Sequence, residues 1–370
     1  MIDIPYFCPN KLCSNHNRED EDTGWYKFWG TYYTKIRGEV PRFCCKKCGK
    51  TFSPQTYSID YYVKVNIDYQ KIEESVHTSS STRDMARQQK VTTEVIRNRV
   101  SRLGRNALAV MAELFLGFIV SESFVADGFE SFAYSQYFPH HINILMGADS
   151  QAFYTADTCV IRRKGNMSSK QKEMRALLEK QWKADPKGII KSFRRLIRYM
   201  KNHVPKDKKT DLLTDEHKAY LIALQRDAEA IEVLNHKRYS SKIKRDHNNP
   251  LFAVNYMDRQ IRKDLANHAR ESVKFAKTIS DMMFRLAIYQ VYHNCNKVYR
   301  EKEAKKTNVK HAEMAGVPIE KIHASYRGYF RRRAFLSKTP LDESARKSWF
   351  RKWENPLRYA NTSVPKFVYM

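Results

Sequence analysis

Four cysteines near the start of the chain have the residue type and spacing of a metal site. They are Cys8, Cys13, Cys45 and Cys48. Cysteine thiolates bind Zn²⁺ at about 2.3 Å, and a site of four thiolates leaves no position open for catalysis. Gly49, directly after the last cysteine, allows the tight turn that two converging thiolates need. We therefore predict a structural zinc ion, with reduced free cysteines in a loop as the alternative.

Two features leave the exact zinc ligands open. The first cysteine pair has the spacing C-x4-C instead of C-x2-C, and both Cys44 and His16 lie next to predicted ligands. The segment 25–33, between the two pairs, is rich in aromatic residues and suits the hairpin of a zinc ribbon. A module this small depends on its metal to fold.

Two acidic residues lie in short apolar segments typical of strands. Asp127 belongs to the segment 124–132, and Asp215 ends the segment 210–215. A single acid at a strand end is more often a cap or turn residue, but two such acids can jointly bind Mg²⁺ or Mn²⁺. A pair of such ions, about 3.5–4 Å apart, activates an attacking water or 3′-hydroxyl and stabilises the leaving oxygen of a phosphodiester. We predict that Asp127 and Asp215 are catalytic metal ligands.

The elements around these acids predict an α+β fold. Apolar patterns indicate strands over 124–132, 141–147, 152–161, 210–215 and 230–234, and helices over 168–182, 187–203 and 218–227. After Pro250 the chain is predicted to be helical for a long way. This order resembles that of an RNase H-like domain, a mixed sheet flanked by helices, with carboxylates on its first strand, at the end of its fourth and on a late helix.

The charge of the chain indicates a polyanionic partner. Lys and Arg number 67 against 40 Asp and Glu, a formal net charge of +27. Such an excess favours nucleic acid over a membrane surface, because no separate basic amphipathic helix is present. No apolar run approaches the roughly 18 residues of a membrane span. We expect a cytoplasmic, nucleoid-associated protein without a signal peptide.

A helix-turn-helix is predicted between the cysteines and the acids. Ser81 or Thr82 can cap a helix that runs through Gln88, and a second helix follows the turn 90–92. Its outward residues are expected to be Arg97, Asn98, Ser101 and Arg102. Arg and Asn are the side chains that read guanine and adenine edges in the major groove. A plain amphipathic helix with a basic face is the alternative.

The residues in this order resemble a family, the transposases of small bacterial insertion sequences of the InsA–InsB type and their single-chain relatives. The matching segments are Ala126-Asp127-Gly128-Phe129-Glu130, Thr214-Asp215 with the following Tyr220, Lys237-Arg238-Tyr239, and Arg262 through Phe275-Ala276-Lys277-Thr278. The resemblance covers roughly residues 5 to 295. It implies a zinc ribbon, a helix-turn-helix and an acidic-triad nuclease.

The third acid of the triad departs from the family pattern. The resemblance implies Glu followed three residues later by Asn, whereas Asn255 and Asp258 stand at these positions. Residues three apart share a helix face, so Asp258 is predicted to be the third carboxylate with Asn255 assisting it. Arg259 and Arg262 are expected to hold the scissile phosphate. Asp264 and Glu271 are alternative acids, and a simple Asp258–Arg262 ion pair is the alternative role.

Four regions are expected. They are a zinc ribbon (1–56), a helix-turn-helix (57–115), an RNase H-like domain (116–295) with a basic helical insertion at about 164–209, and a basic C-terminal region (296–370). We interpret the insertion as a contact with DNA or a partner subunit, or else as a solvated helical hairpin. The C-terminal Arg and aromatic residues favour either phosphate binding or subunit contact.

These features together predict a DNA transposase. It would bind terminal inverted repeats of duplex DNA as a homo-oligomer and use divalent metal to cut and join strands. A non-catalytic DNA-binding regulator derived from a transposase is the main alternative, and an RNA-directed nuclease on the same fold is another.

Overall fold

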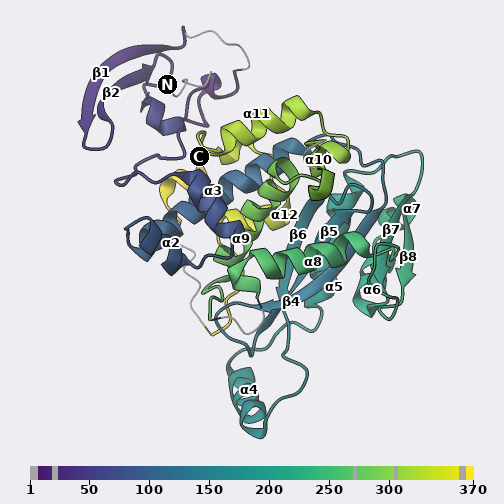
Figure 1. Ribbon diagram of the computed structural model, residues 1–370. Coiled ribbons are helices and arrows are strands. Elements are labelled where there is room, and N and C mark those ends of the chain that lie inside the picture. Colours follow the sequence, from purple (N-terminus) through teal and green to yellow (C-terminus); the bar gives the residue numbers. More distant parts are fainter. Residues whose placement is uncertain (1–6, 19–23, 270–272, 304–306, 358–363) are drawn as a thin grey trace.

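The computed structural model describes residues 7–18, 24–269, 273–303, 307–357 and 364–370. Two sheets and a set of helices make up an α+β fold (Figure 1). The smaller sheet, near the N-terminus, contains β1 (Tyr26–Thr34), β2 (Gly38–Cys45) and β3 (Thr51–Phe52), all antiparallel. Its interior is aromatic, with the Trp25 ring stacked on Phe52 at 5.0 Å between centroids.

Three helices follow the small sheet, and their ends are set by local capping. They are α1 (Tyr69–His77), α2 (Thr82–Gln88) and α3 (Thr93–Leu114). The Ser81 side chain accepts from the N–H of Asp84, whose carboxylate accepts from the N–H of Ser81 in return. The Thr92 hydroxyl accepts from the N–H of Val95 at the start of α3. The predicted start of each of the last two helices is therefore confirmed.

The larger sheet has five strands in the order β6-β5-β4-β7-β8. Their bounds are β4 (Phe124–Phe132), β5 (Pro139–Gly147), β6 (Phe153–Val160), β7 (Thr210–Asp215) and β8 (Leu234–Tyr239). Strands β4, β5 and β6 form an antiparallel meander, whereas β7 pairs parallel to β4 and to β8. The predicted mixed sheet flanked by helices is confirmed.

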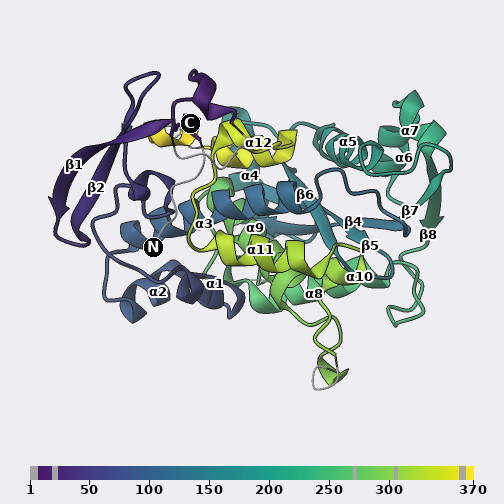
Figure 2. The ribbon, with the colours of Figure 1, turned by 90° about the horizontal axis from the view of Figure 1, so that it is seen from above.

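Helices cover both faces of this sheet (Figure 2). On one face lies α5 (Gly188–Lys201), whose Ser192 hydroxyl accepts from the Asn143 amide of β5 at 2.8 Å. On the other lies α8 (Phe252–Asp264), whose Arg262 guanidinium stacks on the Phe129 ring of β4. Next to β7 and β8 are α6 (Lys218–Gln225) and α7 (Ala228–Val233).

The C-terminal residues do not form a separate unit but pack against α3 and α9 (Ile279–Val291). They contain α10 (His311–Met314), α11 (Ile319–Tyr329) and α12 (Glu343–Trp349). The Asn106 amide of α3 donates to the Tyr329 carbonyl, and the Arg105 guanidinium donates to the Trp349 carbonyl, each at 2.9 Å. Short helical turns complete the described chain: Ser14–His16, Pro54–Tyr57, Ala266–His268, Tyr292–Asn296, Glu301–Glu303, Leu336–Lys338 and Lys366–Tyr369.

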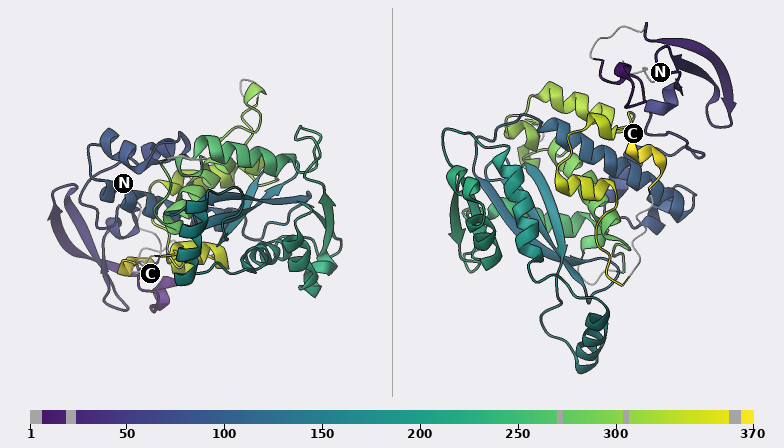
Figure 3. Two further views of the ribbon diagram at one scale, coloured as in Figure 1. Left: turned by 90° about the horizontal axis from the view of Figure 1, so that it is seen from below. Right: turned by 180° about the vertical axis from the view of Figure 1, so that it is seen from behind.

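Two segment predictions need correction. Residues 230–234, predicted as a strand, belong largely to α7, because the Asp227 carboxylate caps that helix and β8 begins only at Leu234. The predicted insertion 164–209 is two unlike pieces. Helix α4 (Ser169–Gln181) buries no residue and projects from the body (Figures 1 and 3), whereas α5 buries Phe193, Leu196, Ile197 and Met200 completely.

Within the described ranges, no helix combines the length and the apolar character that crossing a membrane requires.

Candidate functional site

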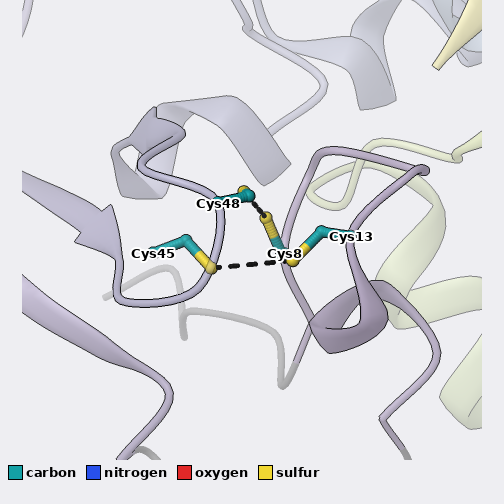
Figure 4. Close-up of side chains that lie close together, drawn as sticks. All are labelled: Cys8, Cys13, Cys45 and Cys48. Atoms are coloured by element: carbon teal, nitrogen blue, oxygen red, sulfur yellow. Dashed lines mark hydrogen bonds between the residues drawn. The ribbon is translucent and has the colours of Figure 1, made fainter.

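The four predicted zinc ligands converge on one point between the N-terminal loop and the end of β2 (Figure 4). The sulfur atoms of Cys8 and Cys48 are 3.6 Å apart and those of Cys13 and Cys45 are 3.8 Å apart. All four sulfurs lie within 4.8 Å of one another. A tetrahedron with Zn–S bonds of about 2.3 Å places its sulfurs about 3.8 Å apart. The geometry therefore fits a structural zinc ion.

Neither alternative ligand joins this cluster. The Cys44 thiol points away and donates to the Gly49 carbonyl at 3.4 Å. Both ring nitrogens of His16 are engaged elsewhere, with the Cys8 carbonyl at 2.7 Å and the Ser337 hydroxyl at 2.9 Å. Burial alone would raise the pKa of the Cys45 thiol, but the Cys48 N–H, the Asn15 amide and the Lys47 N–H lower it to about 6. A thiolate is the form that binds metal.

Asp127 and Asp215 occupy equivalent positions on neighbouring parallel strands. Val125 of β4 pairs with Leu213 of β7, and this is the last pair between the two strands. Each aspartate lies two residues beyond its paired residue, so both side chains project from the same face of the sheet. The two strands separate where the carboxylates begin, and this opening at the sheet's centre is a place where α/β proteins bind ligands.

The charges of neighbouring carboxylates act on Asp127. Burial and, after it, the charge of Asp215 raise the pKa of Asp127 to about 7, and Asp258 adds to this increase. The Gly128 N–H, which donates to Asp127 at 2.7 Å, and the charge of Arg245 oppose it. Like charges crowd at this point of the sheet, and a bound cation would relieve their repulsion.

Asp258 lies on α8, one helical turn before Arg262. Its carboxylate accepts from the Arg262 guanidinium at 2.9 Å, and Arg262 also donates to the Glu130 carbonyl at 3.3 Å. Among the described residues, the four cysteines are the only group of three or more ligand side chains whose ligand atoms all lie within 4.8 Å. The oxygens of the three carboxylates therefore do not all lie within that distance of one another, and Asp258 is paired with Arg262.

The other predicted residues of α8 differ in their surroundings. Asn255 is half-buried and lies three residues before Asp258, hence on the same helix face, whereas Arg259 is exposed. Of the alternative acids, Asp264 accepts from the Tyr289 hydroxyl at 2.8 Å and so has a structural partner. Glu271 lies outside the described residues.

Two further residues, Tyr220 and His141, lie beside Asp127. Burial and the charges of Asp127 and Asp215 raise the pKa of the Tyr220 phenol, which lies on α6 beside the pair. The His141 imidazole of β5 is 3.2 Å from the Tyr220 hydroxyl and 3.1 Å from the Asn143 amide oxygen. The partners come from separate elements, so the sequence identifies Tyr220, as the tyrosine that follows Thr214-Asp215, but gives no signal for His141.

The predicted DNA-reading face of α3 is only partly exposed. Arg97 is exposed and pairs with Glu94 at 3.2 Å, and Asn98 is half-buried. Arg102, expected to point outward, is instead buried: it donates to the Asn98 amide oxygen and the Ile59 carbonyl and stacks on Phe367. Ser101 is buried too. The C-terminal segment covers this part of the helix, and its position could not be deduced from local sequence.

No known protein-family model matches this chain, and no curated protein matches it significantly.

Proposed function

We propose that the protein is a divalent-metal-dependent DNA transposase that cuts and joins DNA strands at the ends of a mobile element. The observation that supports this most is the row formed by Asp127 and Asp215 on β4 and β7, with Asp258 facing it from α8. Two carboxylates from distant segments lie at the opening of the sheet, and the charge of the third, on α8, adds to the raised pKa of Asp127. Structural acids are usually paired with cations, whereas Asp127 is surrounded mainly by like charge.

The strand order favours the RNase H-like class. Three antiparallel strands come first, the fourth strand pairs parallel with the first, and the fifth extends the sheet beyond the fourth. The acids lie on the first strand, at the end of the fourth and on a late helix, as the resemblance to that class requires. Fold alone does not determine activity, so the proposal depends on the acids.

Asp127, Asp215 and Asp258 would hold Mg²⁺ or Mn²⁺. Such ions supply Lewis-acid activation of the attacking oxygen and stabilise the leaving oxygen. The chain's own residues orient the ligands: the Gly128 N–H donates to Asp127, and the His217 N–H donates to Asp215 at 2.9 Å. Asp258 would exchange its contact with Arg262 for the metal, which frees the guanidinium to bind the scissile phosphate.

The remaining features suit a DNA substrate. A net charge of +27 favours a polyanion, and Arg97 with Asn98 lies near the start of α3, where a recognition helix contacts base edges. The four-cysteine module precedes these helices in sequence. Pairing two transposon ends requires at least two active sites, so we expect the protein to act as a homo-oligomer on duplex DNA.

Nicking of a supercoiled plasmid carrying the DNA that flanks the gene tests this function. We expect Mg²⁺- or Mn²⁺-dependent nicking by the wild-type protein and its loss in Asp127→Asn, Asp215→Asn and Asp258→Asn, with plasmid binding retained. Asp211→Asn, on the same strand as Asp215 but paired with Lys237 at 2.6 Å, is the matched control and should nick normally. Normal nicking by Asp127→Asn would contradict the proposal.

A second candidate is a non-catalytic DNA-binding regulator with the same fold. The Asp258–Arg262 ion pair favours it, because a carboxylate already paired with a cation is a poor metal ligand. The same assay separates the two functions, since a regulator would bind the plasmid and never nick it with either metal.

A further inference from the structure

A groove separates the small N-terminal sheet from the connector that leads to α1. Its volume is about 620 Å³, and β1, β2, β3 and the segment 61–64 contribute its walls. This volume lies within the usual range for ligand sites. Neither the carboxylate row on β4 and β7 nor the exposed face of α3 contributes a residue to it.

Among the residues that the structure describes, cations line the groove and no acid does. Lys35, Arg42 and Lys64 line it, and all three are exposed. Within the described ranges, none of them forms an ion pair. The nearby carboxylate of Asp60 is neutralised by Arg37 at 2.7 Å, outside the groove. The positive charge of the groove is therefore available to a polyanion.

Aromatic rings lie among these cations. Tyr62 is 78% exposed, and Tyr32 faces the groove with its hydroxyl near the Ser53 hydroxyl at 3.1 Å. The backbone of Tyr62 has φ of 56°, a conformation unfavourable for a bulky residue. The neighbouring ring of Tyr61 also lines the groove: it lies 4.3 Å from the Tyr62 ring and packs against Phe367 and under the Arg333 guanidinium. The connector thus holds the Tyr62 ring in solvent at a cost in backbone strain.

Flat rings beside unpaired cations recognise unstacked bases and their phosphates. A duplex presents a convex, stacked surface whose bases cannot enter a concave groove, and reading it requires a protruding helix or ribbon. A single strand can turn its bases onto tyrosine rings while Lys and Arg track the backbone. The shape, charge and aromatic content of the groove therefore fit one kind of occupant.

We propose that this groove binds single-stranded DNA, by stacking bases on Tyr62 and Tyr32 and by pairing phosphates with Lys35, Arg42 and Lys64. The inference rests on the proposed function to the extent that strand cutting at an element end supplies single-stranded DNA. It adds a binding site separate from the helix predicted to read duplex ends.

Fluorescence anisotropy of the full-length, zinc-loaded protein with an oligothymidine of about 20 nucleotides tests the site. Tyr62→Ala should weaken binding on the order of ten-fold, because a stacked base is lost, whereas Tyr62→Phe keeps the ring and should bind normally. Lys35→Ala should lower the slope of log affinity against log salt by about 0.7, the value for one phosphate of a single strand.

Tyr33→Ala is the matched control. Tyr33 is 77% exposed and lies next to Tyr32 on β1, but it does not line the groove. Its replacement should therefore leave single-strand affinity unchanged. Wild-type affinity in Tyr62→Ala, or an equal loss in Tyr33→Ala, would overturn the proposal. An equal loss for a duplex of the same length would also overturn it, because the site would not be specific for single strands.

The groove proposal and the proposed function can be refuted separately. If no variant or metal gives nicking but Tyr62→Ala still weakens oligothymidine binding, the groove stands and the nuclease proposal falls. If nicking depends on Asp127 while oligothymidine binding is indifferent to Tyr62, the groove proposal falls alone.

Discussion

The Gly128 backbone lies directly against the His141 imidazole. A Cβ atom at Gly128 would be 2.0 Å from Nε2 and 2.4 Å from Cε1 of His141. The two residues belong to adjacent strands, one directly after Asp127 and the other in contact with Tyr220. The backbone that follows Asp127 of the carboxylate row is thus packed against a buried histidine. The pKa of His141 is lowered to about 4, mainly by burial.

Gly128→Ala should therefore destabilise the protein by about 1–3 kcal/mol, the usual cost of overpacking a core. Urea unfolding measures this change. His141→Ala removes the ring that the new methyl group meets, so the double variant should be more stable than the sum of the two single effects. Strictly additive effects would mean that the two residues do not constrain one another.

The crowded carboxylates predict an unusual pH dependence of stability. The pKa of Asp127 is raised to about 7 in the folded state, above its value of 3.8 without the fold. Its protonated form stabilises the fold fully below about pH 4, and this contribution is lost as pH rises through 7. Without divalent metal, Asp127→Asn should gain about 1–3 kcal/mol over wild type between pH 4 and pH 8. Thermal unfolding at the two pH values measures it.

Asp211→Asn should behave in the opposite way. The pKa of Asp211 is lowered, mainly by its hydrogen bond to Lys237, so its charged form stabilises the fold above about pH 4 and the contribution is lost as pH falls. That variant should lose stability at pH 8 but not at pH 3.

Mg²⁺ at pH 8 should stabilise wild type against thermal unfolding and leave Asp127→Asn unaffected. Equal stabilisation of both proteins would contradict the metal site.

Zinc binding is predicted to depend on Cys45 and not on its neighbour Cys44. Both thiols are buried, but only the first belongs to the four-sulfur cluster. Cys45→Ser should lose the zinc ion, measured by atomic absorption, and expose residues 7–57 to proteolysis, because small zinc modules are unfolded without metal. Cys44→Ser should retain a full complement of zinc. Zinc loss in Cys44→Ser alone would reassign the ligands.

The four-cysteine module also contacts the C-terminal segment near residues 333–338. The N–H of Arg333 donates to the Tyr57 carbonyl at 2.7 Å, and the His16 ring contacts the Ser337 hydroxyl. Proteolysis of the metal-free protein should therefore extend to residues near 333–338, whereas cleavage confined to the module would show that the segment is held by α3 alone.

Two of the four arginines of α3, Arg97 and Arg102, should differ in what their replacement changes: DNA affinity for the first and stability for the second. Arg97 is exposed, so Arg97→Ala should weaken duplex binding with little effect on stability. Arg102 is buried and hydrogen-bonded to Ile59, so Arg102→Ala should lower the free energy of unfolding by about 1–3 kcal/mol. Anisotropy with duplex DNA and urea unfolding distinguish the two. Normal stability of Arg102→Ala would contradict its structural role.

Local signals made much of the fold predictable. Ser81 and Thr92 start helices through short-range capping bonds, and the strands around Asp127 and Asp215 are apolar segments that any window of the sequence reveals. The strand predicted at 230–234 failed because the same apolar residues also suit a short helix, and the Asp227 cap decides between them. The apolar spacing of Phe193, Leu196, Ile197 and Met200 could have identified α5 as a core helix.

Long-range contacts account for what the sequence could not reveal. The burial of Arg102 depends on Phe367, more than 260 positions away, and the contact of Tyr220 with His141 depends on how α6 packs on α5. The Asp258–Arg262 ion pair, in contrast, joins residues four apart on one helix and is the alternative role that the sequence predicts for Asp258.

Manganese binding tests the central claim most directly. Electron paramagnetic resonance of free Mn²⁺ at pH 8, with the zinc-loaded protein, reports how much metal the chain binds. We predict that wild type and Asp211→Asn bind Mn²⁺ and that Asp127→Asn and Asp215→Asn each lose that binding. Equal Mn²⁺ binding by all four proteins, or none by wild type even with DNA present, would contradict a metal site between β4 and β7.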